Sequence, residues 1–253
     1  MTNNRATLDK LDRMRLHGMA RALRTSLDSQ AQCTTDELLA RLVDAEWDDR
    51  HERRLQRLLK AARFRYPAAI EEVDFSLRRN LDQNQLLRLA DCRWVQHHQD
   101  LIITGKCGSG KSFLASALGH QACLRGFRVG YHASSRLFGE LRLAKADGSY
   151  VRELEKISKQ ALIIIDDFAL EPLDAPARLA LLEMLEDRHG RASTLMVSQL
   201  PVSSWHEVIG EPTIGDAICD RIVHGAHRIN LEGDSVRKLY AERARRDGAE
   251  PLG

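Results

Sequence analysis

The sequence predicts an α/β fold in which a parallel five-stranded sheet is flanked by helices and follows a small all-helical N-terminal domain. Two observations predict the sheet: short apolar segments alternate with helical patterns in the C-terminal part of the chain, and a glycine-rich turn separates the first such segment from an apolar helix. The N-terminal domain is predicted because the first 65 residues show helical spacing of apolar side chains and no strand-like alternation. The expected strands are Leu101–Thr104, Arg128–His132, Ala161–Ile165, Thr194–Ser198 and Ala226–Leu231.

We expect three regions along the chain: a helical domain over residues 1–65, a linker over 66–80 and an α/β domain over 81–253. Thr34-Thr35-Asp36-Glu37 is typical of a helix start within the first region. Tyr66-Pro67 ends the helical pattern, because the residue before a proline is pushed out of the α region. Further helices are expected around Leu81–His97 and over Ser135–Ala144 and Ala175–Arg188.

Composition and charge limit the classes of protein. The chain has 253 residues, with 38 lysines and arginines against 36 aspartates and glutamates, so any contact with nucleic acid must come from local basic faces. No apolar run approaches the ~18 residues of a membrane span, and the N-terminus lacks a signal-peptide pattern, so we expect a cytoplasmic protein without a membrane partner. The five cysteines are odd in number and widely spaced, which predicts reduced thiols.

The glycine-rich turn carries the clearest chemical motif. Its sequence, Gly105-Lys106-Cys107-Gly108-Ser109-Gly110-Lys111-Ser112, fits the phosphate-loop pattern G-x-x-x-x-G-K-[ST]. Backbone N–H groups at the start of the following helix attract an anion, Lys111 would reach the β and γ phosphates, and the Ser112 hydroxyl would join the Mg²⁺ shell. The motif therefore predicts a nucleoside triphosphate site. A chance glycine-rich turn is the alternative, and the strand and helix on either side argue against it.

Two acids follow the third expected strand. The run Leu162-Ile163-Ile164-Ile165 is apolar and β-branched, as is typical of a central parallel strand, and it ends in Asp166-Asp167. Ligands of open α/β sheets lie at this carboxyl end of the strands. We expect Asp166 to hold Mg²⁺ and Asp167 to polarise the water that attacks the γ-phosphate. Taken alone, two acids at a strand end would equally well face solvent.

A basic stripe is expected near the end of the helical domain. A 100° helical step places apolar residues on one side of residues 50–62 and basic residues on the other, and between residues 50 and 65 only Glu52 offsets seven basic residues. This pattern favours contact with the phosphates of nucleic acid over a merely solvated charged face. The stripe consists of Arg50, Arg53, Arg54, Arg57 and Lys60.

The order of motifs along nearly the whole chain resembles a known family. The phosphate loop and Asp166-Asp167 are followed by Ser198-Gln199-Leu200-Pro201, Asp220-Arg221-Ile222 and Gly233-Asp234-Ser235-Val236-Arg237. This order resembles AAA+ ATPases of the helicase-loader branch. The strings Leu16-His17-Gly18-Met19-Ala20 and Trp205-His206-Glu207-Val208-Ile209-Gly210 are more specific, and with them the chain resembles the IstB-type ATP-binding helper proteins of bacterial insertion sequences.

The resemblance implies roles for several polar residues around the nucleotide. Gln199 would act as sensor 1 at the γ-phosphate or the attacking water, with Ser198 as the alternative, and both are also suited to capping the next helix. Arg237 would act as sensor 2. Because only 22 residues follow Leu231, no large C-terminal lid is expected and Arg237 must act from a single helix.

The resemblance also implies contacts with other molecules. Arg221 would be the arginine finger that enters a neighbouring subunit's site in trans, where a planar guanidinium suits phosphate oxygens. Arg188 and Arg228 compete for this role, and an intrachain salt bridge is the alternative for each. Arg142 and Lys145 lie where this branch has a helix that contacts nucleic acid, although ordinary surface charge accounts for them equally well.

The resemblance implies an ATP-dependent DNA-binding regulator of transposition in a bacterial cytoplasm. ATP and Mg²⁺ are the expected cofactors, and duplex DNA, the transposase of the same element and further copies of the chain are the expected partners. Slow hydrolysis is expected, because Asp167 stands where many members of the wider class have the longer glutamate. The alternatives are a replicative helicase loader like DnaC, and a small-molecule phosphate-loop NTPase or kinase, which would need an acceptor pocket and no in-trans arginine.

Overall fold

The computed structural model describes residues 2–29, 34–233, 235, 236 and 238, which form two compact units divided after Arg57. The first unit contains α1 (Thr2–Arg13), α2 (His17–Ser29) and most of α3 (Thr35–Ala62), whose last five residues belong to the second unit. The expected helical region is confirmed, but the division lies within α3 instead of at residue 65. Among the described helices, α3 included, none combines the length and the apolar character needed to cross a membrane.

A buried acid joins α2 to α3 in the first unit. Glu46 is 5% exposed, and its carboxylate accepts hydrogen bonds from the backbone N–H groups of Gly18 at 2.9 Å and Met19 at 3.3 Å. Burial opposes its charge, but the hydrogen bonds from Arg50 and from these two amides hold the pKa of Glu46 below its ordinary value. The carboxylate therefore caps the start of α2 and packs it onto α3.

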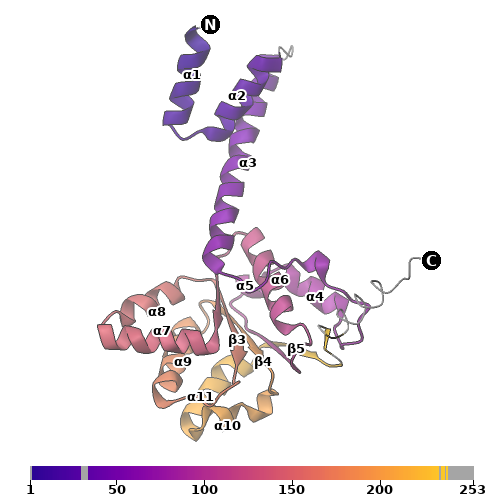
Figure 1. The fold of residues 1–253 in the computed structure, drawn as a ribbon, viewed down its shortest axis with the longest axis vertical. Helices are drawn as coiled ribbons and strands as arrows, with labels where there is room; N and C mark the ends of the chain where they lie inside the picture. Colours follow the sequence, from indigo (N-terminus) through magenta and orange to yellow (C-terminus); the bar gives the residue numbers. More distant parts are fainter. Residues whose placement is uncertain (1, 30–33, 234, 237, 239–253) are drawn as a thin grey trace, which may run out of the picture. The chain divides into compact units, whose positions relative to one another are not determined.

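The second unit is built on five parallel strands in the order β2-β3-β4-β1-β5, of which β3, β4 and β5 are labelled in Figure 1. In chain order, these strands are β1 (Leu101–Gly105), β2 (Val129–Ala133), β3 (Leu162–Phe168), β4 (Ser193–Ser198) and β5 (His227–Leu231). All five lie within a residue or two of the expected strands, apart from the longer carboxyl end of β3, so the predicted sheet is confirmed. The central strands β3 and β4 are buried along almost their whole length and β1 over Leu101–Ile103, as expected for a sheet covered on both faces.

Helices cover both faces of this sheet. One face packs against α7 (Ser134–Asp147), α8 (Tyr150–Ser158), α9 (Ala175–Arg188), α10 (Trp205–Ile209) and α11 (Pro212–Val223). Ile163 and Ile165 of β3 point into that apolar core. Ile164 faces the other side, towards Gly119 of α6 (Lys111–Leu124). This alternation explains why a continuous apolar run forms β3, since each face of the strand has its own helical cover.

The helices differ from expectation in two places. The helix expected around Leu81–His97 is two helices, α4 (Gln83–Ala90) and α5 (Arg93–Gln96), because Cys92 between them has a left-handed backbone with φ of 57°. The helices α8, α10 and α11 were not expected from the sequence. Each is 12 residues or shorter, and α11 begins at a proline, which is favourable only in the first turn of a helix.

The segment expected as a linker is packed onto the second unit. It contains the short 3₁₀ helix η1 (Ile70–Glu72), and Ala68, Ile70 and Val73 are buried. Arg79 is 5% exposed, and its carbonyl accepts a hydrogen bond from the backbone N–H of Glu232 at 3.0 Å. Residues 66–80 therefore form a wall of the second unit, because their apolar side chains supply part of its core.

Candidate nucleotide-binding site

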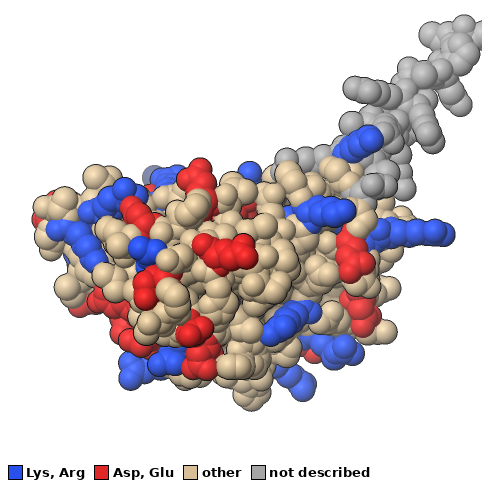
Figure 2. Space-filling view, turned by 90° about the horizontal axis from the view of Figure 1, so that it is seen from below, with Lys and Arg blue, Asp and Glu red and all other residues tan. Residues whose placement is uncertain are grey.

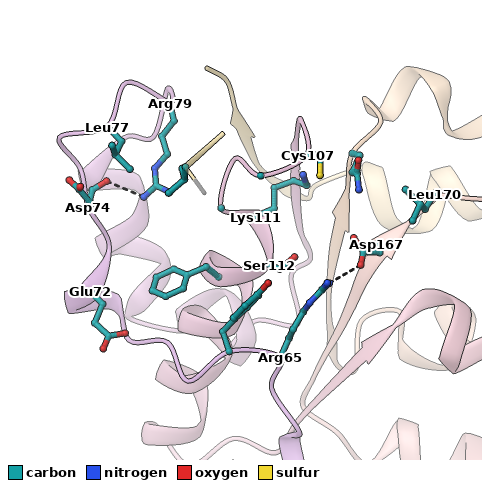
Figure 3. A pocket seen from close by; sticks show the side chains of 16 residues that line it. Arg65, Glu72, Asp74, Leu77, Arg79, Cys107, Lys111, Ser112, Asp167 and Leu170 are labelled. Carbon is teal, nitrogen blue, oxygen red and sulfur yellow. Dashed lines mark hydrogen bonds and ion pairs between the residues drawn. The ribbon is translucent and has the colours of Figure 1, made fainter. Parts of the chain in front are cut away.

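The phosphate loop forms the turn between β1 and α6. Gly108 and Gly110 have φ angles of 81° and 93°, which side chains with a Cβ rarely adopt, so the turn depends on glycine at these positions. Lys111 is 6% exposed, and its Nζ donates a hydrogen bond to the carbonyl of Lys106 at 2.8 Å, which bends the side chain back over the loop (Figure 3). The loop thus places the buried ammonium group of Lys111 beside the backbone N–H groups at the start of α6.

A β-bulge brings the two acids of β3 to the same side. Ile165 pairs with Met196 of β4, but Phe168 pairs with Ser198, so β3 contains one extra residue here. Asp167 takes up the difference with a left-handed backbone, at φ of 56°. Side chains of neighbouring residues in a regular strand point to opposite faces, and a bulge changes this direction. As a result, both carboxylates contact one guanidinium group.

That guanidinium belongs to Arg65, which follows α3. Its Nη1 lies 2.8 Å from Oδ2 of Asp167, the contact drawn in Figure 3, and 3.2 Å from Oδ2 of Asp166. The hydrogen bond to Asp167 is the main reason that the pKa of Arg65 is raised above its already high value, so the group is a permanent cation. Nothing in the sequence near residue 65 indicated this contact, because more than 100 residues separate the partners.

Asp166 is fully buried and accepts hydrogen bonds from four groups. Its Oδ1 accepts from Ser112 Oγ at 3.1 Å and from the backbone N–H of Asp167 at 2.9 Å, and its Oδ2 accepts from Arg65 and from the hydroxyl of Tyr131. Burial, followed by the charge of Asp166, raises the pKa of Tyr131 well above its ordinary value, so the phenol stays a donor. Ser112 and Asp166, expected to share Mg²⁺, are in direct contact and offer the oxygen ligands that this ion prefers.

A cavity of about 550 Å³ lies beside the loop, a size typical of small-molecule sites. The expected residues Cys107, Gly108, Gly110, Lys111, Ser112, Asp167 and Gln199 line it. Much of the remaining wall comes from the supposed linker and its neighbours, which the sequence analysis did not assign to the site. These residues are Arg65, Tyr66, Glu72, Asp74, Leu77 and Arg79. The cavity is therefore polar at the loop and partly apolar on the side of residues 66–79.

The structure separates the two sensor candidates at the end of β4. Gln199 lines the cavity, whereas Ser198 is buried, donates its hydroxyl to the carbonyl of Phe168 at 2.8 Å and accepts the backbone N–H of Leu200 at 3.1 Å. Ser198 thus stabilises the turn after β4 and does not face the cavity. Arg237 lies outside the described residues. Its neighbour Val236 lines the cavity and donates its backbone N–H to the carbonyl of Gly108 at 2.9 Å.

The three arginines considered for the in-trans contact have different surroundings. Arg188 is 1% exposed and its guanidinium donates to the carbonyls of Ile157, Gln160 and Ser193 at 2.5–3.0 Å, so it serves the fold of its own chain. Burial lowers the pKa of Arg188 to about 10. Arg221 on α11 is partly exposed and pairs with Asp220 at 2.9 Å and with Glu186 at 3.7 Å. Arg228 is exposed on β5.

Acids that precede the basic stripe on α3 neutralise part of it. Arg50 Nε lies 2.7 Å from Glu46 Oε1, and Arg53 Nε lies 2.6 Å from Asp49 Oδ2. The expectation that Glu52 alone offsets the stripe is therefore wrong. It counted acids only from residue 50 onwards, whereas Glu46 and Asp49 lie one helical turn before Arg50 and Arg53 and pair with them. The other stripe residues, Arg54, Arg57 and Lys60, are exposed.

Arg142 and Lys145 on α7 are exposed and also have intrachain contacts. Arg142 lies 3.4 Å from Asp174, and the Lys145 ammonium lies 4.5 Å from the centre of the Tyr150 ring. On the face shown in Figure 2, basic and acidic side chains of the described residues alternate, and they form no large patch of one sign. Because the net charge of the chain is small, contact with nucleic acid by Arg142 and Lys145 depends on their own charges and those of their nearest neighbours.

The fold and the loop define the chain as an α/β protein of the phosphate-loop class. Solved structures show the same fold: DnaI at a TM-score of 0.55 and 20% identity, covering 70% of this chain and 93% of that one. The DnaC helicase loader is similar at a TM-score of 0.51 and 18% identity, covering 69% of this chain and 98% of that one.

Comparison of sequences gives the family. The model of the IstB-like ATP binding protein family matches residues 9–244, so the chain belongs to this family, as the motifs predicted. The insertion sequence ATP-binding protein y4pL of Sinorhizobium fredii is 47% identical over 92% of this chain and 96% of its own length. The insertion sequence IS1162 ATP-binding protein of Pseudomonas fluorescens is 41% identical over 78% of this chain and 87% of its own length.

Labelling of Cys107 by a maleimide should be strongly slowed by ATP, because this exposed thiol lines the cavity at the phosphate loop. Cys92 and Cys123 should not react in the folded protein, since both are buried and burial raises the pKa of the two thiols to about 11 and about 12. Peptide mass spectrometry measures the rate at each cysteine, with Cys107→Ser as the control for assignment. Equal labelling of Cys107 with and without saturating nucleotide would place the nucleotide elsewhere.

Proposed function

We propose that this protein is an ATP-dependent DNA-binding regulator of transposition, which assembles on duplex DNA with ATP, selects target DNA and recruits and stimulates the transposase of its element. The observation that carries the proposal is a preformed phosphate site, in a family whose members are ATP-binding proteins of insertion sequences. Slow hydrolysis of ATP, stimulated by DNA or by a partner, ends the assembled state.

The residues of the cavity suit the parts of Mg²⁺-ATP. The backbone of Gly105–Ser112 and the ammonium of Lys111 hold the phosphates. Mg²⁺ would be held by Ser112 and Asp166, whose oxygens are already in contact, and when bound it neutralises charge on the phosphates. The partly apolar wall over residues 66–79 suits the nucleoside.

Two side chains at the edge of this cavity suit hydrolysis. Asp167 accepts a proton from the attacking water or orients it, and Gln199, directly after the neighbouring strand β4, contacts the water or the γ-phosphate. The slow rate follows from the short side chain of Asp167. Arg237 adds a contact to the γ-phosphate in this proposal.

Assembly couples the nucleotide to DNA. Arg221 of one subunit contacts the γ-phosphate bound to its neighbour, after release from Asp220 and Glu186. Loss of the γ-phosphate on hydrolysis removes this contact and weakens the interface. DNA phosphates are bound by the stripe on α3 and by Arg142 and Lys145 on α7. Those basic side chains that contact another residue of the chain give up this contact when they bind a phosphate.

The proposal predicts that Lys111→Ala remains monomeric under conditions in which the wild type assembles. Without the ammonium group, the phosphates lose their buried counter-charge, so ATP can no longer stabilise the subunit interface. Mass photometry with and without duplex DNA, in ATP held unhydrolysed and in ADP, measures the particle mass. Large DNA-bound particles are expected only for the wild type with ATP.

Arg125→Ala serves as the matched control, because Arg125 is an exposed residue that follows the opposite end of α6. This variant should assemble like the wild type. A wild-type monomer that binds ATP but ignores DNA would favour a small-molecule NTPase. Assembly that needs a replicative helicase in place of DNA would favour a helicase loader, like the structurally similar DnaC helicase loader.

A further inference from the structure

The acids expected to serve Mg²⁺ and water already have a cation bound. The Arg65 guanidinium contacts Oδ2 of both Asp166 and Asp167, at 3.2 and 2.8 Å. Asp166 accepts three further hydrogen bonds, so each of its two carboxylate oxygens has two donors. One guanidinium therefore neutralises both carboxylates at the place where the proposed function puts Mg²⁺ and the attacking water.

We propose that Arg65 is a built-in counter-ion that occupies the two acids in the nucleotide-free protein, and that its departure admits Mg²⁺ and frees Asp167. The proposal rests on the proposed function, because it assumes that the cavity binds Mg²⁺-ATP. A divalent ion and a guanidinium both seek the same carboxylate oxygens and repel each other. Binding of Mg²⁺ at these acids therefore includes the work of displacing Arg65.

A groove next to the nucleotide cavity can receive the Arg65 side chain after its displacement. Arg65 and Asp167 line the nucleotide cavity and also a second, larger groove of about 1180 Å³ between β2, α7, α8 and the end of α3. Two carboxylates that line the groove, Glu140 and Glu153, are exposed or half-buried and already pair with Arg136 at 2.9 Å and Lys156 at 2.6 Å. A displaced Arg65 would there join existing ion pairs at the solvent-exposed surface. The Arg65 side chain is 42% exposed, so a change of rotamer needs no opening of the core.

The position of Arg65 links this exchange to α3. Only Arg63 and Phe64 separate it from Ala62, the last residue of that helix. Phe64 is fixed below the site: its ring packs edge-on against Tyr131 at 6.2 Å between centres, and a Cβ on Gly119 would lie 2.5 Å from it. A movement of the end of α3 relative to Phe64 changes the distance over which the Arg65 side chain can extend. A ligand that moves α3 would in this way alter how often Arg65 contacts Asp166 and Asp167.

Equilibrium binding of a fluorescent, non-hydrolysable ATP analogue over a series of Mg²⁺ concentrations tests the proposal. Arg65→Ala should lower the Mg²⁺ concentration at half-saturation by about tenfold or more, the scale of a lost charge-assisted hydrogen bond. Arg65→Lys should fall between this variant and the wild type, because an ammonium keeps the charge but lacks the fork that bridges two acids. Arg125→Ala, the exposed control, should match the wild type.

Hydrogen exchange of the peptide over residues 58–68 provides the second readout. In the wild type, Mg²⁺ with the analogue should raise exchange in this peptide relative to the analogue in EDTA, because the contact that ties Arg65 down is lost. Arg65→Ala should show the raised level without any ligand. An unchanged Mg²⁺ requirement in Arg65→Ala overturns the proposal, and so does weaker binding of the analogue in EDTA, which would make Arg65 a nucleotide contact. Failure of the wild type to bind the analogue at all would instead overturn the proposed function.

Discussion

Replacement of Arg188 by alanine should destabilise the second unit by about 3–5 kcal/mol, because three buried carbonyls lose a charged donor at about 1–3 kcal/mol each. The guanidinium is 1% exposed and donates to the carbonyls of Ile157 and Gln160 at the end of α8 and of Ser193 at the start of β4. Alanine would remove the guanidinium donor from all three carbonyls, of which that of Ile157 would keep the backbone N–H of Gln160 at 3.1 Å. Asp100, whose pKa burial raises to about 6, would also lose the favourable charge beside it.

Urea unfolding followed by tryptophan fluorescence measures this change, because Trp94 and Trp205 are buried in the second unit. Arg191→Ala is the matched control: this arginine is three residues away and exposed, so its loss should alter the free energy of unfolding by less than about 0.5 kcal/mol. A fully stable Arg188→Ala that fails to assemble with ATP would mean that Arg188, and not Arg221, acts in trans.

Replacement of Asp167 by asparagine should lower the rate of ATP hydrolysis by about 10²–10⁴-fold, the usual contribution of a positioned acid or base. Asparagine has the same shape and tolerates the left-handed backbone at this position, but it cannot accept a proton from water. Binding of ATP should persist, because Lys111, Ser112 and Asp166 are unchanged. The variant thus separates binding from hydrolysis.

Single-turnover hydrolysis, with DNA present and ATP below the protein concentration, measures the chemical step. Glu171→Gln is the control, since this exposed acid lies a few residues further along the chain. Assembly of Asp167→Asn on DNA should last longer than that of the wild type, because the γ-phosphate is kept. Hydrolysis at the wild-type rate would show that a group other than Asp167 orients the water.

Features that depend on local pattern could be predicted from the sequence. The strands were predictable because a parallel strand with helices on both faces must be apolar throughout, as Leu162–Ile165 is. The phosphate loop was predictable because glycine tolerates the positive φ angles of Gly108 and Gly110 and leaves a recognisable spacing. In each case the neighbours along the chain carry the information.

Features that depend on distant partners could not be predicted. Arg65 appeared as one more basic residue near a helix end, and only the fold places it on acids 101 and 102 residues away. The packing of residues 66–80 was hidden for the same reason, since Tyr66-Pro67 ends a helix without indicating where the chain goes next. Gln199 and Ser198 are neighbours in sequence with similar polarity, and the structure alone shows which of them faces the cavity.

The extra residue in β3 changes the direction of the two carboxylates without changing how the strand pairs with β4. Up to Ile165 the strand is in register with β4, and from Phe168 it is in register again, so the sheet itself is complete without the insertion. A chain shortened by one residue at this point would keep its strand pairing but would direct one of the two carboxylates to the opposite face. Such a protein would keep its sheet but would no longer bring both carboxylates to the Arg65 guanidinium. The length of the chain at this position, and not only the identity of its residues, therefore determines the geometry of the site.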